Sequence, residues 1–214
     1  MESAIILAVE IAGIIAFTIS GAVVAIDKGL DVFGVALIGV LTALGGGVIR
    51  DIILGIFPPI MFTYKIYAVT SLISSLIVFI IAYVDRKRFF SSINIIDKVV
   101  NIFDAIGLGL FAVTSVQRCF QHGYGDNAFL CIFMAMTTCI GGGIMRDLLC
   151  QRLPAVLRKR IYALAAIAGG AVYYYMHKIT FNSDLSMIFG ASTAILIRLM
   201  ATKFKWNMPR IERD

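Results

Sequence analysis

The chain has 214 residues, of which 60% are hydrophobic, and it carries a net charge of +6. Its mean hydropathy of +0.92 excludes an ordinary water-soluble domain, in which roughly 45–50% of residues are apolar. The positive charge does not indicate a nucleic-acid partner, because the lysines and arginines of membrane proteins gather in cytoplasmic loops.

Seven apolar stretches are long enough to cross a hydrocarbon core, which takes about 20 residues per helix. They cover residues 3–26, 32–55, 65–84, 101–120, 127–150, 160–177 and 184–202. The first is not a signal peptide, because it lacks a basic start, is too long and carries Glu10. The sequence therefore predicts an all-α membrane protein, with one transmembrane domain of seven helices over residues 1–214.

Basic residues outside the helices are distributed unevenly. Thirteen follow the first, third, fifth or seventh stretch, including the runs at 85–88 and 158–160, whereas Lys65, Arg118 and Lys178 fall on the other side. The positive-inside rule places the thirteen in the cytoplasm, where the two runs are also candidates to contact anionic membrane lipid. We expect a multi-pass protein of the bacterial cytoplasmic (inner) membrane, with its N-terminus outside and a short cytoplasmic tail over residues 203–214.

A Gly-Gly-Gly-x-x-Arg-Asp motif occurs twice, beginning at Gly45 and at Gly141, 96 residues apart. Flanking residues agree at offsets of 94 or 95: Glu10 with Asp104, Gly13 with Gly107, Phe17 with Phe111, Ser20 with Thr114, Pro59 with Pro154 and Tyr67 with Tyr162. Each copy holds three stretches, and an odd number inverts the second copy in the membrane. We expect repeat one at 3–84, repeat two at 101–177, and the helix at 184–202 outside the repeats.

Both glycine triplets lie roughly 20 Å along their helices, somewhat past the middle of a bilayer. They are Gly45, Gly46, Gly47, Gly141, Gly142 and Gly143. Each glycine weakens a helix by about 0.8–1 kcal/mol relative to alanine, so we expect a kink or an unwound turn that lines a path. Close packing of two helices through small residues is the alternative.

Six of the ionisable residues in these stretches are candidates for a charge network at membrane depth, where a charge costs about 2.5–3.5 kcal/mol. They are Glu10, Arg50, Asp51, Asp104, Arg146 and Asp147. Symmetry predicts the pairs Glu10–Arg50 and Asp104–Arg146. Neighbours such as Arg50 and Asp51 point about 100° apart on a helix and are not expected to satisfy each other fully. Whether the arginines are structural or line a path stays open.

Other residues are weaker candidates. Four hydroxyls could line a hydrated path or bond back to their own helices: Ser20, Thr42, Thr114 and Thr138. Phe17 and Phe111 could form a hydrophobic constriction or simply pack in the core. Pro58, Pro59 and Pro154 are expected to stop the second and fifth helices.

No cofactor, resident metal or disulfide framework is expected. Cys119, Cys131, Cys139 and Cys150 show no C-x-x-C spacing. Neither histidine has a second ligand at metal spacing, and no nucleophile–base pair indicates an enzyme.

The doubled motif, in stretches arranged three plus three plus one, resembles the prokaryotic TRIC family of trimeric intracellular cation channel homologues. It is equally similar to bacterial membrane proteins associated with glycine uptake. The resemblance covers about residues 4–202. It implies a homotrimer with one pore per subunit, conduction of K⁺ or another monovalent cation without a resident metal, and a pore between the second and fifth helices, kinked at their glycine triplets.

Three functions remain open at this point. A passive monovalent-cation channel agrees best with the resemblance. A secondary transporter for a small amino acid such as glycine would suit inverted repeats, with Arg50 or Arg146 holding a carboxylate. A membrane scaffold, in which the glycines only pack, is the third.

Overall fold

The computed structural model describes residues 4–86, 89, 93–158, 161–204 and 206. Within these residues it contains nine helices and no strand. The helices are α1 (Ala4–Asp27), α2 (Val32–Ile53), α3 (Ile60–Thr63), α4 (Lys65–Val84), α6 (Ile93–Gln121), α7 (Ala128–Leu149), α8 (Ala155–Arg158), α9 (Tyr162–Thr180) and α10 (Ser183–Lys203). The predictions for Lys87, Arg88, Lys159, Arg160 and the tail after residue 206 lie outside the described residues.

Six of the long helices, α1, α2, α4, α6, α7 and α10, are long and apolar enough to cross a membrane. α9 has 19 residues but is less apolar, because its second half carries three tyrosines followed by His177 and Lys178. The all-helical membrane fold is therefore confirmed, and the crossing by α9 stays a prediction.

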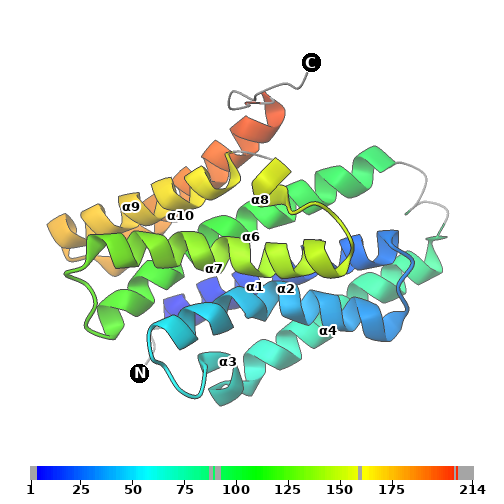
Figure 1. The fold of residues 1–214 in the computed structure, drawn as a ribbon, viewed down its shortest axis with the longest axis horizontal. Helices are drawn as coiled ribbons and strands as arrows, with labels where there is room; N and C mark the ends of the chain where they lie inside the picture. Colours follow the sequence, from blue (N-terminus) through cyan, green and yellow to red (C-terminus); the bar gives the residue numbers. More distant parts are fainter. Residues whose placement is uncertain (1–3, 87–88, 90–92, 159–160, 205, 207–214) are drawn as a thin grey trace.

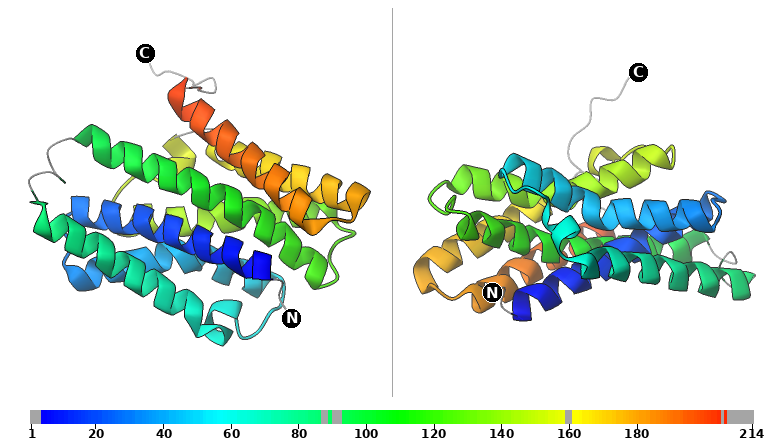
Figure 2. Two further views of the ribbon diagram at one scale, coloured as in Figure 1. Left: turned by 180° about the vertical axis from the view of Figure 1, so that it is seen from behind. Right: turned by 90° about the horizontal axis from the view of Figure 1, so that it is seen from below.

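The helices form two groups of the same construction (Figures 1 and 2). α1 packs against α2 and α4, and α6 packs against α7 and α9. The groups meet through equivalent helices, α1 against α6 and α2 against α7, while α10 covers α6 and α9. The turns after α1 and α7 lie at one end of the bundle, and those after α2, α6 and α9 lie at the other, with the start of α1. This is the arrangement expected of an inverted repeat.

Equivalent residues begin and end α2 and α7. The Asp31 side chain accepts a hydrogen bond from the Gly34 backbone N–H at 2.8 Å, and Asn127 accepts one from Leu130 at 3.0 Å. Such side chains satisfy the free N–H groups of a first helical turn. Each helix therefore starts where the sequence offers a short polar cap.

The ends of α2 and α7 are set by backbone conformation, and the expectation that prolines stop them is wrong. α2 ends at Ile53 and α7 at Leu149, before any of the prolines. Shortly after each end, Gly55 and Gln151 have positive φ of 71° and 52°, the left-handed conformation that commonly terminates helices. The prolines instead lie just ahead of the short helices α3 and α8.

Candidate functional site

The two glycine triplets form the crossing point of α2 and α7. A methyl group on Gly46 would lie 2.0 Å from the carbonyl oxygen of Thr138, and one on Gly142 would lie 2.0 Å from that of Thr42. Only a hydrogen fits at either position, so the two backbones are in direct contact. The contact is reciprocal, as expected if the two-fold axis of the repeat passes between the helices.

The unwound turn expected at each triplet is not present. α2 is continuously helical over Val32–Ile53 and α7 over Ala128–Leu149. The low helix propensity of glycine is offset by close contact of the two backbones, which a larger residue would prevent. The packing alternative therefore describes these glycines better than the break.

Phe17 and Phe111 form a second symmetric contact. Their rings stack with centroids 5.4 Å apart and planes 12° from parallel. Each ring also covers the glycine of the other repeat: a methyl group on Gly107 would lie 2.6 Å from Phe17, and one on Gly13 would lie 3.2 Å from Phe111. Both rings are buried. The pair fills the space between α1 and α6 at mid-height.

The four candidate hydroxyls have different partners. Thr42 donates to the Ile38 carbonyl at 2.6 Å, and Thr114 lies 3.5 Å from the Phe111 carbonyl, so both turn back to their own helices. Thr138 has no hydrogen-bond partner in the described part of the chain. Only Ser20 joins the charged residues.

A charged cluster joins three helices at the end of the bundle that holds the turns after α1 and α7, which we call the inner end after the expected orientation. Nη1 of Arg146 donates to Asp104 at 2.8 Å and to the Ser20 hydroxyl at 2.7 Å, and Ser20 itself donates to Asp104 at 3.2 Å. Nε of Arg146 donates to Asp147 at 2.8 Å. The predicted pair Asp104–Arg146 is confirmed, and it ties α7 to α6 and α1.

At the opposite end, called the outer end, the predicted pair Glu10–Arg50 is not formed. Glu10 instead accepts hydrogen bonds from Nη2 of Arg118, at 2.8 and 2.9 Å, and from the Tyr67 hydroxyl. Arg50 turns to its neighbour Asp51, which it contacts through Nε at 2.8 Å and Nη2 at 2.7 Å. The expectation that adjacent Arg50 and Asp51 do not satisfy each other fully is wrong, because the long arginine side chain turns back toward Gly47 on its own helix and makes two bonds to Asp51.

Asp51 and Asp147 have a second, equivalent task. The free oxygen of Asp51 accepts the backbone N–H of Ile60 at 2.9 Å, and that of Asp147 accepts the N–H of Ala155 at 2.8 Å. Each aspartate thus fixes its arginine with one oxygen and the start of α3 or α8 with the other. This explains why the motif ends in Arg-Asp rather than in arginine alone.

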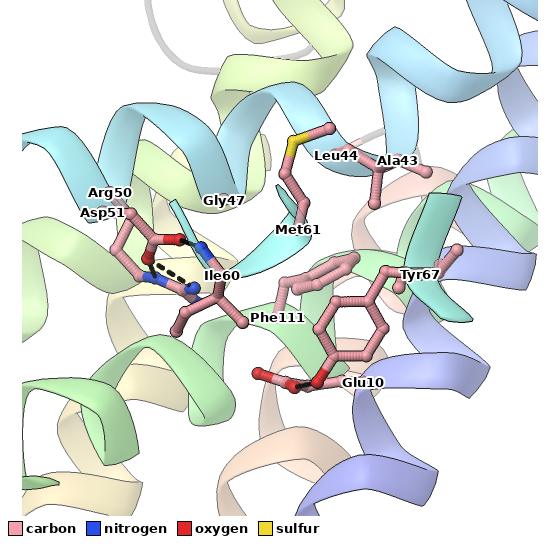
Figure 3. A pocket seen from close by; sticks show the side chains of 11 residues that line it. Glu10, Ala43, Leu44, Gly47, Arg50, Asp51, Ile60, Met61, Tyr67 and Phe111 are labelled. Atoms are coloured by element: carbon pink, nitrogen blue, oxygen red, sulfur yellow. Dashed lines mark hydrogen bonds and ion pairs between the residues drawn. The ribbon is translucent and has the colours of Figure 1, made fainter. Parts of the chain in front are cut away.

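Each cluster borders a small cavity. The outer cavity, of about 30 Å³, lies among Glu10, Arg50, Asp51, Tyr67 and Phe111, with apolar neighbours. Figure 3 shows the Arg50–Asp51 pair at one side of it and the Glu10–Tyr67 pair at the other. The inner cavity, of about 20 Å³, is lined by the equivalent residues Asp104, Arg146, Asp147 and Ala155. Polar cavities of this size have room for one or two waters.

The two cavities lie on opposite sides of the Phe17–Phe111 pair. Along α1, Glu10 lines the outer cavity and Val24 the inner one. Phe17 is midway between them, roughly 10 Å from each along the helix axis. The molecule therefore holds two charged cavities separated by a mid-height layer of aromatic rings and crossed glycine backbones.

Two buried arginines were missed as site residues in the sequence. The charge distribution places Arg118 on the outer side, whereas its position seven residues after Phe111, on the same helix face, indicates that it points into the bundle. Arg198 on α10 is also buried. Its guanidinium lies over the Tyr162 ring, 4.9 Å from the centroid, and it donates to Thr202 at 3.0 Å.

Comparison with known proteins agrees with the repeat and the fold. A family model described as "Glycine transporter" matches residues 7–83 and again residues 101–178. The UPF0126 membrane protein YvgT of Bacillus subtilis is 34% identical over 200 residues, covering 94% of this chain and 93% of the relative. The UPF0126 inner membrane protein YadS of Escherichia coli K12 is 32% identical over 208 residues, covering 96% and 95%.

Solved structures of similar sequence share the fold. A prokaryotic TRIC channel in 0.5 M KCl has a TM-score of 0.85 at 35% identity, over 97% of this chain and 100% of that one. The TRIC trimeric intracellular cation channel orthologue from Rhodobacter sphaeroides has a TM-score of 0.84 at 31% identity, over 94% and 99%. The chain therefore belongs to the family described as glycine transporter, whose bacterial members are named UPF0126 membrane proteins, and it has the fold of the prokaryotic TRIC channels.

Proposed function

We propose that this chain is a monovalent-cation channel, with K⁺ as its first candidate ion. The observation that carries the proposal is the pair of equivalent charged cavities on either side of one mid-height barrier, in a fold shared with TRIC cation channels at 31–35% identity. Four carboxylates border the cavities, Glu10 and Asp51 outside and Asp104 and Asp147 inside. Carboxylates at depth attract cations into a narrow path.

The proposed path runs through each subunit, from the outer cavity past Phe17 and Phe111 to the inner cavity. α2 and α7 both line it, but they touch at Gly46 and Gly142, so ions would pass beside their crossing, toward α1 and α6. The conformation described here is closed at this level, because both phenylalanine rings are buried and stacked. Conduction requires these rings to move.

A secondary transporter for a small amino acid such as glycine is the second candidate. Two cavities that flank a closed barrier are also the geometry of alternating access, in which a substrate reaches only one side at a time. Arg50 or Arg146 would then hold the carboxylate. The family's description as glycine transporter is in line with this reading.

Flux in liposomes separates the two candidates. Purified protein would be reconstituted, and K⁺ flux and glycine uptake measured in parallel. A channel gives K⁺ flux that follows the electrochemical gradient, with discrete single-channel steps and without glycine uptake. Saturable glycine uptake without K⁺ conductance would overturn the channel proposal.

Isosteric variants connect the flux to the cavities. Asp104→Asn and Glu10→Gln each remove one buried charge, and we expect either to lower K⁺ flux at least several-fold. Asp126→Asn is the matched control, because Asp126 lies in a loop and pairs with Lys178 at the surface, at 2.7 Å. Equal flux in all three variants would show that conduction does not depend on the charged residues of the cavities.

We further infer a homotrimer in the bacterial inner membrane, surrounded by lipid, with the N-terminus outside. The similar protein from Rhodobacter sphaeroides is described as a trimeric channel orthologue, and YadS is named an inner membrane protein. A C-terminal green fluorescent protein should fluoresce and a C-terminal alkaline phosphatase should be inactive, since the thirteen basic residues favour a cytoplasmic C-terminus. The reverse pattern would overturn the orientation.

A further inference from the structure

Equivalent residues of the two repeats are in different states. In the outer half, Glu10 is held by Tyr67 and Arg118, and Arg50 contacts Asp51. In the inner half, the roles of Glu10, Tyr67 and Arg50 fall to Asp104, Tyr162 and Arg146. There Arg146 bridges Asp104 and Asp147, a bridge that Arg50 does not make.

The inner half contains buried donors that are not used. A methyl group on Gly143 would lie 3.4 Å from the Tyr162 hydroxyl and 3.8 Å from Nη2 of Arg146, so the hydroxyl is close to the arginine that holds Asp104. No hydrogen-bond partner lies within bonding geometry of this hydroxyl, or of Nε and Nη2 of Arg198, in the described part of the chain. Arg198 stacks on the Tyr162 ring, so all these donors are side by side. Buried donors without acceptors are unfavourable, and a charged one at membrane depth is more so.

Tyr162 and Arg198 have the same residue types as Tyr67 and Arg118, which both bind Glu10. Each half therefore combines a tyrosine that the repeat conserves with an arginine that it does not. Arg118 corresponds to Val24 in repeat one, and Arg198 lies on α10, outside both repeats. Outside, this pair binds its carboxylate, Glu10. In the inner half, the Asp104 carboxylate is instead paired with Arg146.

We propose that Tyr162 and Arg198 form a second binding position for the Asp104 carboxylate, and that Asp104 exchanges between this position and Arg146. The role of the exchange in opening the inner cavity rests on the proposed function. In the observed state, Arg146 ties α7 to Ser20 on α1 and Asp104 on α6. In the other state, Asp104 would tie α6 to α9 and α10, and the contact between α7 and α6 would be released. Tyr162 and Arg198 are therefore positioning residues.

The exchange leaves both Asp104 and Arg146 paired in either state. Arg146 would keep Asp147, to which Nε already donates, and this is the arrangement that Arg50 and Asp51 show in the outer half. Arg198, which contacts no carboxylate among the residues that the structure describes, would gain one. The outer half thus serves as an observed example of the state proposed for the inner half.

Fluorine NMR tests the exchange without reference to transport. 3-Fluorotyrosine would be introduced at position 162 alone in the full-length protein, and at position 67 alone as the reference for a tyrosine bonded to a carboxylate. Arg146→Gln removes the present partner of Asp104. Ser20→Ala removes only the hydroxyl that bonds to both Arg146 and Asp104, and it serves as the milder variant if Arg146→Gln does not fold. We expect either variant to move the position-162 resonance toward the position-67 value, and Arg198→Leu added to the same variant to reverse the shift.

A position-162 resonance that stays unchanged in Ser20→Ala and in any folded Arg146→Gln protein would overturn the exchange.

A flux measurement in liposomes tests the role of Tyr162 in opening. Tyr162→Phe should lower K⁺ flux about tenfold, since a hydrogen bond to a charged group stabilises one state by that order. Its melting temperature should not fall, because the hydroxyl is unbonded in the observed state. Tyr67→Phe, the matched control, loses an existing bond and should melt lower. An unchanged flux in Tyr162→Phe would show that Tyr162 has no role in opening. Absence of K⁺ flux in the parent protein would overturn the proposed channel function, but the NMR test of the exchange would still hold.

Discussion

Gly46 and Gly47 are neighbours with opposite surroundings. A methyl group on Gly46 would lie 2.0 Å from the backbone oxygen of Thr138, which cannot move without shifting α7, whereas one on Gly47 would have its nearest neighbour, the flexible Arg50 side chain, at 3.9 Å. We expect Gly46→Ala to destabilise the protein by about 1–3 kcal/mol through overpacking. Gly47→Ala should be neutral or stabilise it by up to about 1 kcal/mol, because alanine favours a helix.

Thermal unfolding in detergent would rank these two variants against the parent protein. Gly142→Ala and Gly143→Ala repeat the comparison on α7, because a methyl group would lie 2.0 Å from the Thr42 oxygen in the first and 3.4 Å from the Tyr162 hydroxyl in the second. Equal stability of Gly46→Ala and Gly47→Ala would show that α2 and α7 are not in backbone contact.

Asp51 and Asp147 should differ in importance although they are equivalent in sequence. Asp51 is the carboxylate that pairs with Arg50, whereas Arg146 has Asp104 as well as Asp147. Removing one partner of a buried pair costs about 3–5 kcal/mol when it leaves the other charge uncompensated. We therefore expect Asp51→Asn to lower the melting temperature clearly more than Asp147→Asn. The opposite order would mean that Arg50 has Glu10 within reach after all.

Between helices, the Arg118–Glu10 pair fastens α6 to α1 at the outer end. Both side chains are buried and their charged atoms are 2.8 Å apart. We expect Arg118→Leu to cost about 3–5 kcal/mol, since it leaves a buried carboxylate without its cation, and the double variant with Glu10→Leu to recover much of the loss. Arg152→Leu is the control: its pair with Asp27 is part-exposed, so it should cost about 1 kcal/mol or less. Additive losses in the double variant would contradict this account.

Helices and their symmetry could be read from the sequence, but the pairing between helices could not. Hydropathy predicted the seven long helices, and the doubled motif predicted the Asp104–Arg146 contact. The same symmetry failed at Glu10, because Arg118 has no equivalent in repeat one and takes the place assigned to Arg50. The glycine triplets misled for a related reason: helix propensity describes an isolated helix, whereas the contact between Gly46 and Gly142 depends on a second helix that lies almost 100 residues away.

At the scale of the whole molecule, the barrier between the two cavities is built from few side chains. Phe17 and Phe111 contribute its aromatic layer, and each is held in place by a glycine of the other repeat. A hydrophobic layer of this kind blocks ions because water does not remain in it. Replacing one phenylalanine by a smaller residue would leave room for water between the outer and inner cavities. The barrier to ions should therefore weaken even if no helix moves.

We therefore expect Phe17→Ala and Phe111→Ala to raise K⁺ flux in liposomes several-fold above the parent protein, although each should cost about 3–5 kcal/mol of stability. A gain of flux with a loss of stability is a useful signature, because general unfolding would abolish selective flux rather than increase it. Phe129→Ala is the matched control, since that ring is 79% exposed on α7 and its removal should change neither quantity. If neither core variant raised the flux while both remained folded, the ion path would have to bypass this layer, and the two cavities would no longer be parts of one pathway.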